Sequence, residues 1–210
     1  MSIQENNQLT DGNAAGMTIL FIDLETGGLS GLLDNGHMGC QYYPIFQIAL
    51  IVTDQELQKI APPMVIHVHQ TEEMIARSHE WAINQHTKTG LLKASRESGT
   101  TLAEAEDTII EYLKAFGINA YDRTSKIGPV MAGNSITLDR MFISAQMPKL
   151  EAYMHYRQID ISSVAMLGRA MGKNLLEDVD KRYTHNALDD IEECLIEARH
   201  YCRTLFNAEI

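Results

Sequence analysis

The order of strand-like and helix-like segments constrains the fold of this chain more than any other feature. Three apolar segments rich in β-branched and aromatic residues come first, at Met17–Asp23, Phe46–Thr53 and Met64–His69. Strand-like and helix-like segments alternate after them. An antiparallel meander followed by strand–helix units predicts an α/β fold, in which helices flank a mixed central sheet.

Hydrophobic periodicity places the later elements. Two further strands are expected over Val130–Ala132 and Tyr156–Ile161. The expected helices cover Thr71–Arg77, Glu80–Gln85, Thr100–Phe116, Leu138–Gln146, Ser162–Met171 and Asn186–Phe206. The third of them starts at "TTLAEAED", which offers a Thr cap and early acids, as helix N-termini favour. Each of the two later strands is thus followed by a helix.

Length and composition fit one domain. The chain has 210 residues, of which 45% are hydrophobic, which is enough for a core. Residues 1–16 are polar and have no apolar periodicity, so we expect a disordered tail followed by a single domain over 17–210. The three cysteines, Cys40, Cys194 and Cys202, are too few for a disulfide framework and are expected to be reduced thiols.

The charge limits the partners. The formal net charge is −11, and no basic stripe is visible, which argues against extended binding to long DNA or RNA. A small phosphate-bearing ligand remains compatible, because acids that bind metal become part of a cationic site. No apolar run is long enough to span a bilayer, and no signal peptide is recognisable. We therefore expect a soluble, cytoplasmic protein with no membrane partner.

Two carboxylates close the first strand, in the stretch "ILFIDLETGG". Asp23 and Glu25 are two residues apart, so on a strand their side chains point to the same face. They lie where the strand emerges, which is a usual place for a site in an α/β sheet. The pair alone favours a blander alternative, a solvated strand end. Asp139, in "GNSITLDRMF", has a bland alternative too, as an acid that interacts with a helix dipole.

The stretch "YTHNALDDIEECL" supplies a fourth acid and a histidine. His185 and Asp190 are five apart, which is wrong for one face of a helix. The spacing makes sense if His185 precedes the helix and Asn186 is its N-cap, with Asp189 in a capping-box-like role three positions later. Asp189 would then stabilise the helix start, while Asp190 points into the site.

Four acids at three separated points of the sequence, together with a histidine, are the set of residues that a two-metal phosphodiesterase needs. Mg²⁺ and Mn²⁺ prefer carboxylate and water oxygens as ligands. Two such ions about 3.5–4 Å apart activate a water and stabilise the departing oxygen. Histidine is suited to take the proton of that water near neutral pH. The sequence therefore predicts two divalent cations, Mg²⁺ or Mn²⁺, as cofactors.

The stretches "IDLETGG", "NSITLD" and "HNALDD" resemble, in order and spacing, the three motifs of the DEDDh superfamily of 3′–5′ exonucleases. The stretch "MPKLEAYMHYRQIDISS" is similar to the most distinctive part of one subgroup, the oligoribonucleases. The resemblance implies a ribonuclease H-like fold and a single exonuclease domain over residues 17–210. The catalytic residues that it implies are the metal ligands Asp23, Glu25, Asp139 and Asp190 and the general base His185.

The resemblance also implies how a short RNA or DNA substrate, in particular a dinucleotide, is held. Leu29 and Trp81 would pack against two bases, and His86 would contact the substrate near the scissile bond. The implied cap of the 5′ phosphate consists of Ser135, Arg157, Ser162 and Ser163. Tyr156 would reach the substrate in the neighbouring subunit of a homodimer. Arginine suits a terminal phosphate, and stacking accepts any base.

Blander interpretations accompany these roles. A lone tryptophan such as Trp81 is most often a core residue, and Tyr156 with Arg157 could be a surface pair. The connection over residues 30–45 is longer than is usual in the family. We expect it to form a flap or dimer-contact element that adjusts which substrates enter.

Three functions are weighed. The first is hydrolysis of dinucleotides and very short oligonucleotides from the 3′ end to 5′-mononucleotides. The second is broader 3′–5′ exonuclease activity on single-stranded DNA or RNA, of the ribonuclease T or proofreading type, which the motif "DLETGG" and the insertion leave open. The third is a binding module without catalysis. All four acids and the histidine are present, which disfavours the third.

Overall fold

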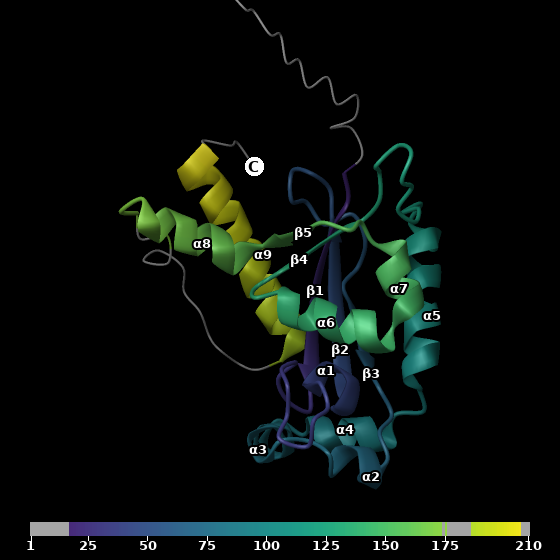
Figure 1. Cartoon of the computed structure of the whole chain (residues 1–210). Helices are drawn as coiled ribbons and strands as arrows, with labels where there is room; N and C mark the ends of the chain where they lie inside the picture. The colour runs from purple at the N-terminus through teal and green to yellow at the C-terminus, as the bar shows by residue number, and fades with distance from the viewer. Residues whose placement is uncertain (1–16, 174, 176–185, 207–210) are drawn as a thin grey trace, which may run out of the picture.

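Five strands form one mixed sheet in the order β3-β2-β1-β4-β5 (Figure 1). The computed structural model describes residues 17–173, 175 and 186–206, so the predicted disordered tail over residues 1–16 lies outside the described part of the chain. The strands are β1 (Ile19–Thr26), β2 (Ile45–Thr53), β3 (Met64–His67), β4 (Val130–Gly133) and β5 (Gln158–Asp160). The first three are antiparallel neighbours, and β4 and β5 continue the sheet in parallel with β1. The predicted α/β class with a mixed sheet is confirmed.

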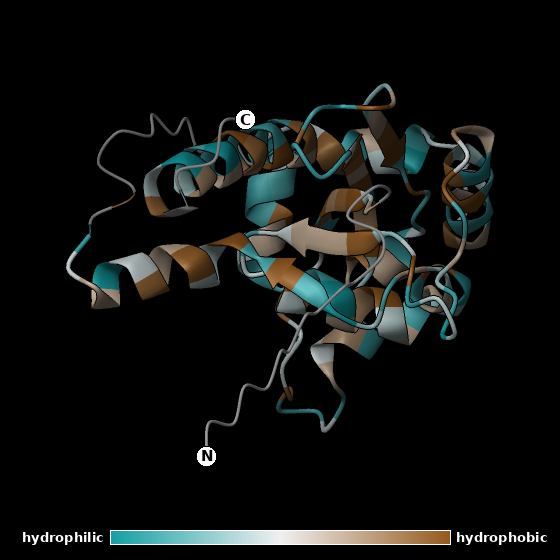
Figure 2. Cartoon of the chain, turned by 90° about the horizontal axis from the view of Figure 1, so that it is seen from above, coloured by the Kyte–Doolittle hydropathy of each residue, from teal (hydrophilic) through white to brown (hydrophobic). Residues whose placement is uncertain are grey.

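Nine helices surround the sheet in the described residues. They are α1 (Gly39–Tyr42), α2 (Glu72–Ile75), α3 (Glu80–Lys88), α4 (Leu91–Glu97), α5 (Leu102–Ala115), α6 (Thr137–Gln146), α7 (Pro148–Tyr153), α8 (Ile161–Ala170) and α9 (Ala187–Phe206). Seen from above, helices lie on both sides of the strands (Figure 2). Of the helices in the described ranges, none combines the length and the apolar character needed to cross a lipid bilayer.

The alternation of β1 divides the core into two layers. Leu20, Ile22 and Leu24 are buried in a cluster with residues of α5, α6 and α7. Ile19 and Phe21 point the other way, into a cluster that α9 closes. Because successive strand side chains face opposite sides, every odd-numbered residue of β1 is directed towards α9.

The helix ends follow ordinary capping chemistry. Thr101 and Glu104 form a reciprocal capping box at the start of α5, as its sequence predicts. Pro148 ends α6 but also occupies the first turn of α7, where its missing N–H is no loss. Helix α7 is not among the predicted helices, because a proline that follows a helical pattern is an ordinary sign of a helix end.

Other expectations about elements need correction. Helices α1 and α4 were not predicted, because both are short; α4 also follows directly from a left-handed Gly90 after α3. The expected strand over Tyr156–Ile161 is only Gln158–Asp160, since β4 offers a partner edge of just three residues, Met131–Gly133. Tyr156 and Arg157 therefore precede the strand instead of lying on it.

Candidate active site

The site lies where β1 and β4 separate. The parallel pairing between them ends at Phe21 and Ala132, whereas β2 accompanies β1 to its end. One side of the last half of β1 is thus left without a strand. Asp139, from the first turn of α6, approaches this side, and its Oδ1 accepts a hydrogen bond of 3.0 Å from the N–H of Leu24. Divergence of neighbouring strands is the general origin of ligand crevices in α/β sheets.

Three carboxylates converge on the face of the sheet that α9 covers. Asp23 and Glu25 continue the odd-numbered series of β1 and so face α9. Asp190 lies in the first turn of α9, one turn before the buried Cys194. Asp23, Glu25 and Asp190 each offer an oxygen within 4.8 Å of the others, and in the described residues this is the one group with such metal-ligand spacing. Such crowding needs a compensating positive charge.

Burial and mutual repulsion raise the pKa values of these acids. Removal from solvent, followed by the charges of Asp139, Glu25 and Asp190, raises the pKa of Asp23 well above its ordinary value. Burial, then Asp190 and Asp139, raises the pKa of Glu25 to about 7. Burial also raises the pKa of Asp139 to about 7, against the opposing effect of the hydrogen bond from Leu24. The charged forms of these groups are therefore disfavoured without a cation.

The start of α9 is held against the sheet. Asn186 caps the helix, as predicted, since its Oδ1 accepts a bond of 3.1 Å from the N–H of Leu188. The neighbouring Ala187 N–H donates to Oε1 of Gln47, which pairs with Glu25 across β1 and β2. His185 lies outside the described residues. Its assignment as general base stays a prediction.

Gln47 was not singled out from the sequence. Its signal is a polar residue within "IFQIALIVT", a strand whose residues are all buried. Its side chain is only 4% exposed and reaches Nε2 of His67 at 2.8 Å as well as the first residue of α9. Gln47 thus ties the helix that carries Asp190 to the strand next to Glu25.

Comparisons with known proteins agree with this geometry. The profile of a family described as Exonuclease matches residues 20–198. An oligoribonuclease of Halorhodospira halophila is 39% identical over 185 residues, which cover 88% of this chain and 92% of that protein. An oligoribonuclease of Vibrio vulnificus is 38% identical over 188 residues, covering 90% and 95%.

The chain belongs to the exonuclease family. It is a 3′–5′ exonuclease, a hydrolase of phosphodiester bonds, and the resemblance to oligoribonucleases is confirmed. Family membership implies the use of divalent metal ions. The acids fit that requirement, because Asp23, Glu25 and Asp190 offer the oxygen ligands that hard cations prefer, at mutual distances that bare carboxylates avoid.

Solved structures show the same fold. Exonuclease I from Methylocaldum szegediense superposes with a TM-score of 0.63 at 19% identity, and covers 90% of this chain and 41% of its own. E. coli exonuclease I in complex with a 5cy-dT13 oligonucleotide gives 0.64 at 16% identity, with the same coverage. The exonuclease thus spans about two fifths of those chains, and the ribonuclease H-like fold expected for it is confirmed.

His86 lies behind the acids. Its side chain is 2% exposed, with Nε2 at 2.9 Å from the carbonyl oxygen of Thr26 and Nδ1 at 3.9 Å from Oε2 of Glu25. The imidazole therefore contacts the end of β1 and the Glu25 carboxylate. A direct contact with substrate, which the resemblance implies, stays a prediction.

Two apolar side chains, one shortly after β1 and one at the start of α3, stand exposed. Leu29 is 74% exposed and Trp81 is 60% exposed, which rules out the alternative of Trp81 as a core residue. The two segments are linked, because the N–H of His79 at the start of α3 donates to the carbonyl of Gly27 at 2.7 Å. Exposed apolar surface at this place suits the face of a base.

The long connection after β1 is an ordered hairpin. Leu32 and Met38 form a β-bridge, and α1 follows. Nε2 of Gln146 in α6 donates to the carbonyls of Cys40 and Tyr43 at 2.7 and 2.9 Å. Gly39 is required here, because a Cβ would lie 1.9 Å from the carbonyl oxygen of Leu29. Figure 1 shows the segment between α3 and the start of α9.

The residues assigned to a terminal phosphate are brought together only in part. Ser135 lies two residues after the end of β4, and its N–H donates to Oγ of Ser162 at 3.1 Å. Ser163 is exposed in the first turn of α8, where its N–H donates to Oδ1 of Asp160. Arg157 is exposed, and its guanidinium carbon lies 5.4 Å from the ring centre of Tyr156, so the pair that the bland interpretation expects does form.

Tyr156 belongs to a group of aromatic rings on the surface. It is 58% exposed and stacks on His155 with ring centres 4.6 Å apart, while Tyr121 meets both rings edge-on. The role of Tyr156 towards a substrate in a neighbouring subunit, which the resemblance implies, stays a prediction.

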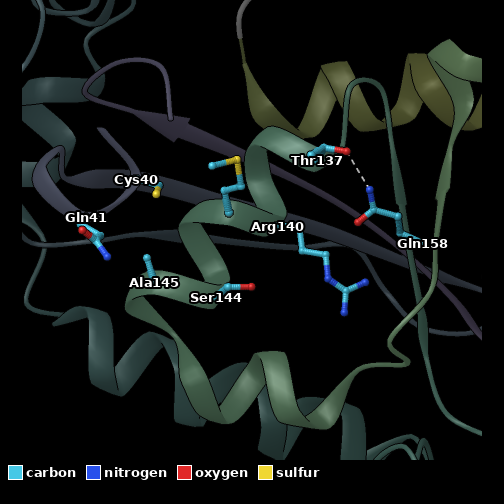
Figure 3. A pocket seen from close by; sticks show the side chains of 8 residues that line it. Cys40, Gln41, Thr137, Arg140, Ser144, Ala145 and Gln158 are labelled. Atoms are coloured by element: carbon cyan, nitrogen blue, oxygen red, sulfur yellow. Dashed lines mark hydrogen bonds between the residues drawn. The ribbon is translucent and has the colours of Figure 1, made fainter. Parts of the chain in front are cut away.

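A separate hollow of about 450 Å³ lies on another face of α6 (Figure 3). Thr137, Arg140, Met141 and Ser144 of this helix line it at helical spacing, whereas the Asp139 carboxylate is directed to β1. Across the hollow, Nε2 of Gln158 donates to Oγ1 of Thr137 at 2.8 Å. The hollow is therefore distinct from the group of acids.

Proposed function

We propose that the exonuclease hydrolyses dinucleotides and very short oligoribonucleotides, one nucleotide at a time from the 3′ end, to 5′-mononucleotides. The observation that carries this proposal is the group of Asp23, Glu25 and Asp190, with Asp139 beside it, in a chain 38–39% identical to oligoribonucleases over nearly its whole length. The absence of a basic stripe from the sequence agrees with a short substrate, because long strands are held through many phosphates.

We infer that two divalent cations, Mg²⁺ or Mn²⁺, occupy the acid group. Asp23, Glu25, Asp139 and Asp190 would hold them, which would relieve the repulsion that raises the carboxyl pKa values. When bound, such ions supply positive charge for an attacking water and for the departing oxygen. His185, one residue before the cap of α9, would accept the proton of the water.

The substrate would be held at both ends. Leu29 and Trp81, both exposed, would pack on the bases, which accepts any base sequence. The subsite for the 5′ phosphate would be formed by Ser135, Arg157, Ser162 and Ser163. A closed cap over this phosphate would limit the length of the substrate. His86, next to Glu25, would act near the scissile bond.

A homodimer is part of the proposal. Tyr156 is exposed at the surface, and in the proposed dimer its ring would reach the substrate bound by the neighbouring subunit. Sedimentation or light scattering tests the homodimer directly. A Tyr156→Ala variant should have lower activity, because its side chain can no longer contact the substrate of the neighbouring subunit. A monomeric active enzyme would contradict the assignment.

The second candidate is a broader 3′–5′ exonuclease on single-stranded DNA or RNA. The observation that favours it is the hairpin after β1, with Leu29 and Leu32 exposed beside the site, because extra apolar surface could accept further bases. The fold likeness to exonuclease I does not decide between the candidates, since it concerns the fold alone.

One assay separates the two candidates. An end-labelled dinucleotide, a seven-mer and a thirty-mer, each as RNA and as DNA, are incubated with the protein and Mn²⁺ or Mg²⁺. Rapid loss of the dinucleotide with little attack on the thirty-mer is the expected result. Processive shortening of the thirty-mer would instead establish the broader activity, and no turnover of any substrate would contradict both.

A further inference from the structure

Helix α9 also carries a buried acid that lies outside the acid group. Glu197 is 1% exposed and lies about two turns after Asp190. Its Oε2 accepts a bond of 3.0 Å from the hydroxyl of Tyr201, and its Oε1 accepts one of 3.4 Å from Nδ2 of Asn134. A buried carboxylate requires such donors. One of them comes from the turn after β4, far away in the sequence.

Glu197 decides which way the amide of Asn134 points. A carboxylate only accepts hydrogen bonds, so the nitrogen of the amide must face Glu197 and the oxygen must face away. That oxygen, Oδ1, accepts a bond of 3.1 Å from Oγ of Ser162 at the start of α8. The single hydroxyl proton of Ser162 is thereby directed to Asn134. Its oxygen is left to accept the N–H of Ser135, at 3.1 Å.

The last residue of this chain of bonds has an unusual backbone. Ser135 has a φ of +51°, one of three non-glycine residues with positive φ in the described ranges. A non-glycine residue in this conformation is unfavourable and needs support from its surroundings. The support consists of the bonds from its N–H to Ser162 and to Oδ1 of Asp160, the latter at 3.2 Å.

We propose that Glu197 is a positioning residue for the 5′-phosphate subsite: through Asn134 and Ser162 it holds the Ser135 turn in the shape that receives the phosphate. The inference rests on the proposed function of Ser135 and its neighbours. Glu197 itself is buried and does not touch the substrate. The proton of Ser162 is committed to Asn134, so Ser162 acts mainly by ordering the turn, and the Ser135 and Ser163 hydroxyls and Arg157 face the phosphate.

The test compares two substrates that differ only in the subsite concerned. Values of kcat/KM are measured with Mn²⁺ for a 5′-phosphorylated dinucleotide and for the same dinucleotide with a 5′-hydroxyl. Glu197→Leu should lower the preference for the phosphorylated substrate by about tenfold, mainly through KM, which corresponds to one charge-assisted hydrogen bond. A purely structural loss would reduce both activities alike and leave the ratio unchanged.

Two further variants sharpen the test. Glu197→Gln should restore the preference, because its amide oxygen can still accept from Asn134. Tyr201→Phe removes a different partner of the same carboxylate, so it should lower stability but leave the ratio as in the wild type. Asn134→Ala breaks the link nearer the surface, and it replaces Glu197→Leu if that variant does not fold.

The outcomes separate this inference from the proposed function. If the wild type prefers the 5′-phosphorylated substrate and both Glu197→Leu and Asn134→Ala keep that preference, the positioning role is overturned while the subsite stands. If the wild type shows no preference, the proposed phosphate subsite fails, and the positioning role fails with it.

Discussion

Glu106 on α5 is buried and the pair Asp23 and Glu25 on β1 is largely removed from solvent, but these carboxylates meet opposite partners. Glu106 is 4% exposed, and one of its oxygens accepts the N–H groups of Lys149 and Leu150 at 2.7 and 2.9 Å. These are free donors at the positive end of α7. Asp23 and Glu25 face other carboxylates instead.

The difference separates structural acids from functional ones. A buried carboxylate surrounded by protein donors completes the fold without help, as Glu106 does for α7. A buried carboxylate surrounded by acids is unfavourable until a cation arrives. Burial alone therefore says little about function, and the chemical nature of the neighbours says much more.

The largest expected effect on activity comes from replacing one carboxylate of the acid group. Asp190→Asn should lower kcat/KM by about a thousandfold or more, because several kcal/mol of charge stabilisation through metal depend on its ligands. Steady-state kinetics on a dinucleotide with Mn²⁺ measures the loss, and circular dichroism checks the fold.

Asp189→Ala is the matched control, since this neighbour is exposed and outside the acid group. It should retain activity and lose about 1 kcal/mol of unfolding free energy if Asp189 stabilises the helix start. Equal losses of activity in the two variants would contradict the division of roles between Asp189 and Asp190.

Glu106→Ala should show the reverse pattern. The N–H groups of Lys149 and Leu150 would lose their acceptor, which destabilises the fold by about 1–3 kcal/mol. Urea denaturation measures the change, while kcat of the folded fraction should stay at the wild-type value. A strong loss of kcat at full folding would mean that Glu106 is not merely structural.

Metal removal should lower the stability of the folded protein, because the carboxylates of the acid group then repel one another. The folded-state pKa of Glu25, about 7, lies above its ordinary value of 4.5. Its contribution to stability is therefore fully present below about pH 4.5 and is lost as the pH rises through 7. The acids need a cation most at high pH, so the gain in Tm from Mg²⁺ over EDTA should be larger at pH 8 than at pH 5.

This prediction has an internal control. In an Asp190→Asn variant one charge that raises the pKa of Glu25 is gone, so the metal-dependent gain at pH 8 should shrink. Each kcal/mol corresponds to about 2–4 °C for a chain of this size, which thermal scans resolve. A gain that does not change with pH would indicate that the metal binds elsewhere.

The smallest effect is expected at Gln47, which lies opposite Glu25 on β2 and whose side chain holds the start of α9. Gln47→Leu removes the acceptor of the Ala187 N–H and should loosen the start of the helix. We expect Mn²⁺ affinity to fall by about tenfold, at the low end for residues that orient metal ligands. Calorimetric titration with Mn²⁺ measures it, and unchanged affinity would show that α9 is held by other contacts.

The sequence predicted the strand and helices that carry the acids more reliably than the short helices around them. Strand β1 and the helices α6 and α9 follow from hydrophobic periodicity and from helix-capping residues, which are local features of the sequence. The four acids follow from a family resemblance whose motifs are short and ordered. The short helices α1, α4 and α7 escaped prediction, because few residues contribute to their periodicity.

The roles of Gln47, Asn134 and Glu197 could not be predicted, because they depend on contacts between distant segments. Gln47 meets Ala187 across 140 residues, and Asn134 meets Glu197 across 63. The sequence marks them only as polar residues in apolar surroundings. Which donor faces which acceptor is decided when the segments pack.

By itself the sequence determined the class of the fold and the family, and it predicted the identity of the acids, since these depend on side-chain chemistry and local spacing. Only the tertiary structure decided that Asp23 and Glu25 face Asp190 while Asp139 approaches β1 from the other layer. It also decided which buried acids meet donors and which meet other acids. The physical reason is that pKa and metal affinity depend on distance and burial in space, which the order of residues along the chain does not specify.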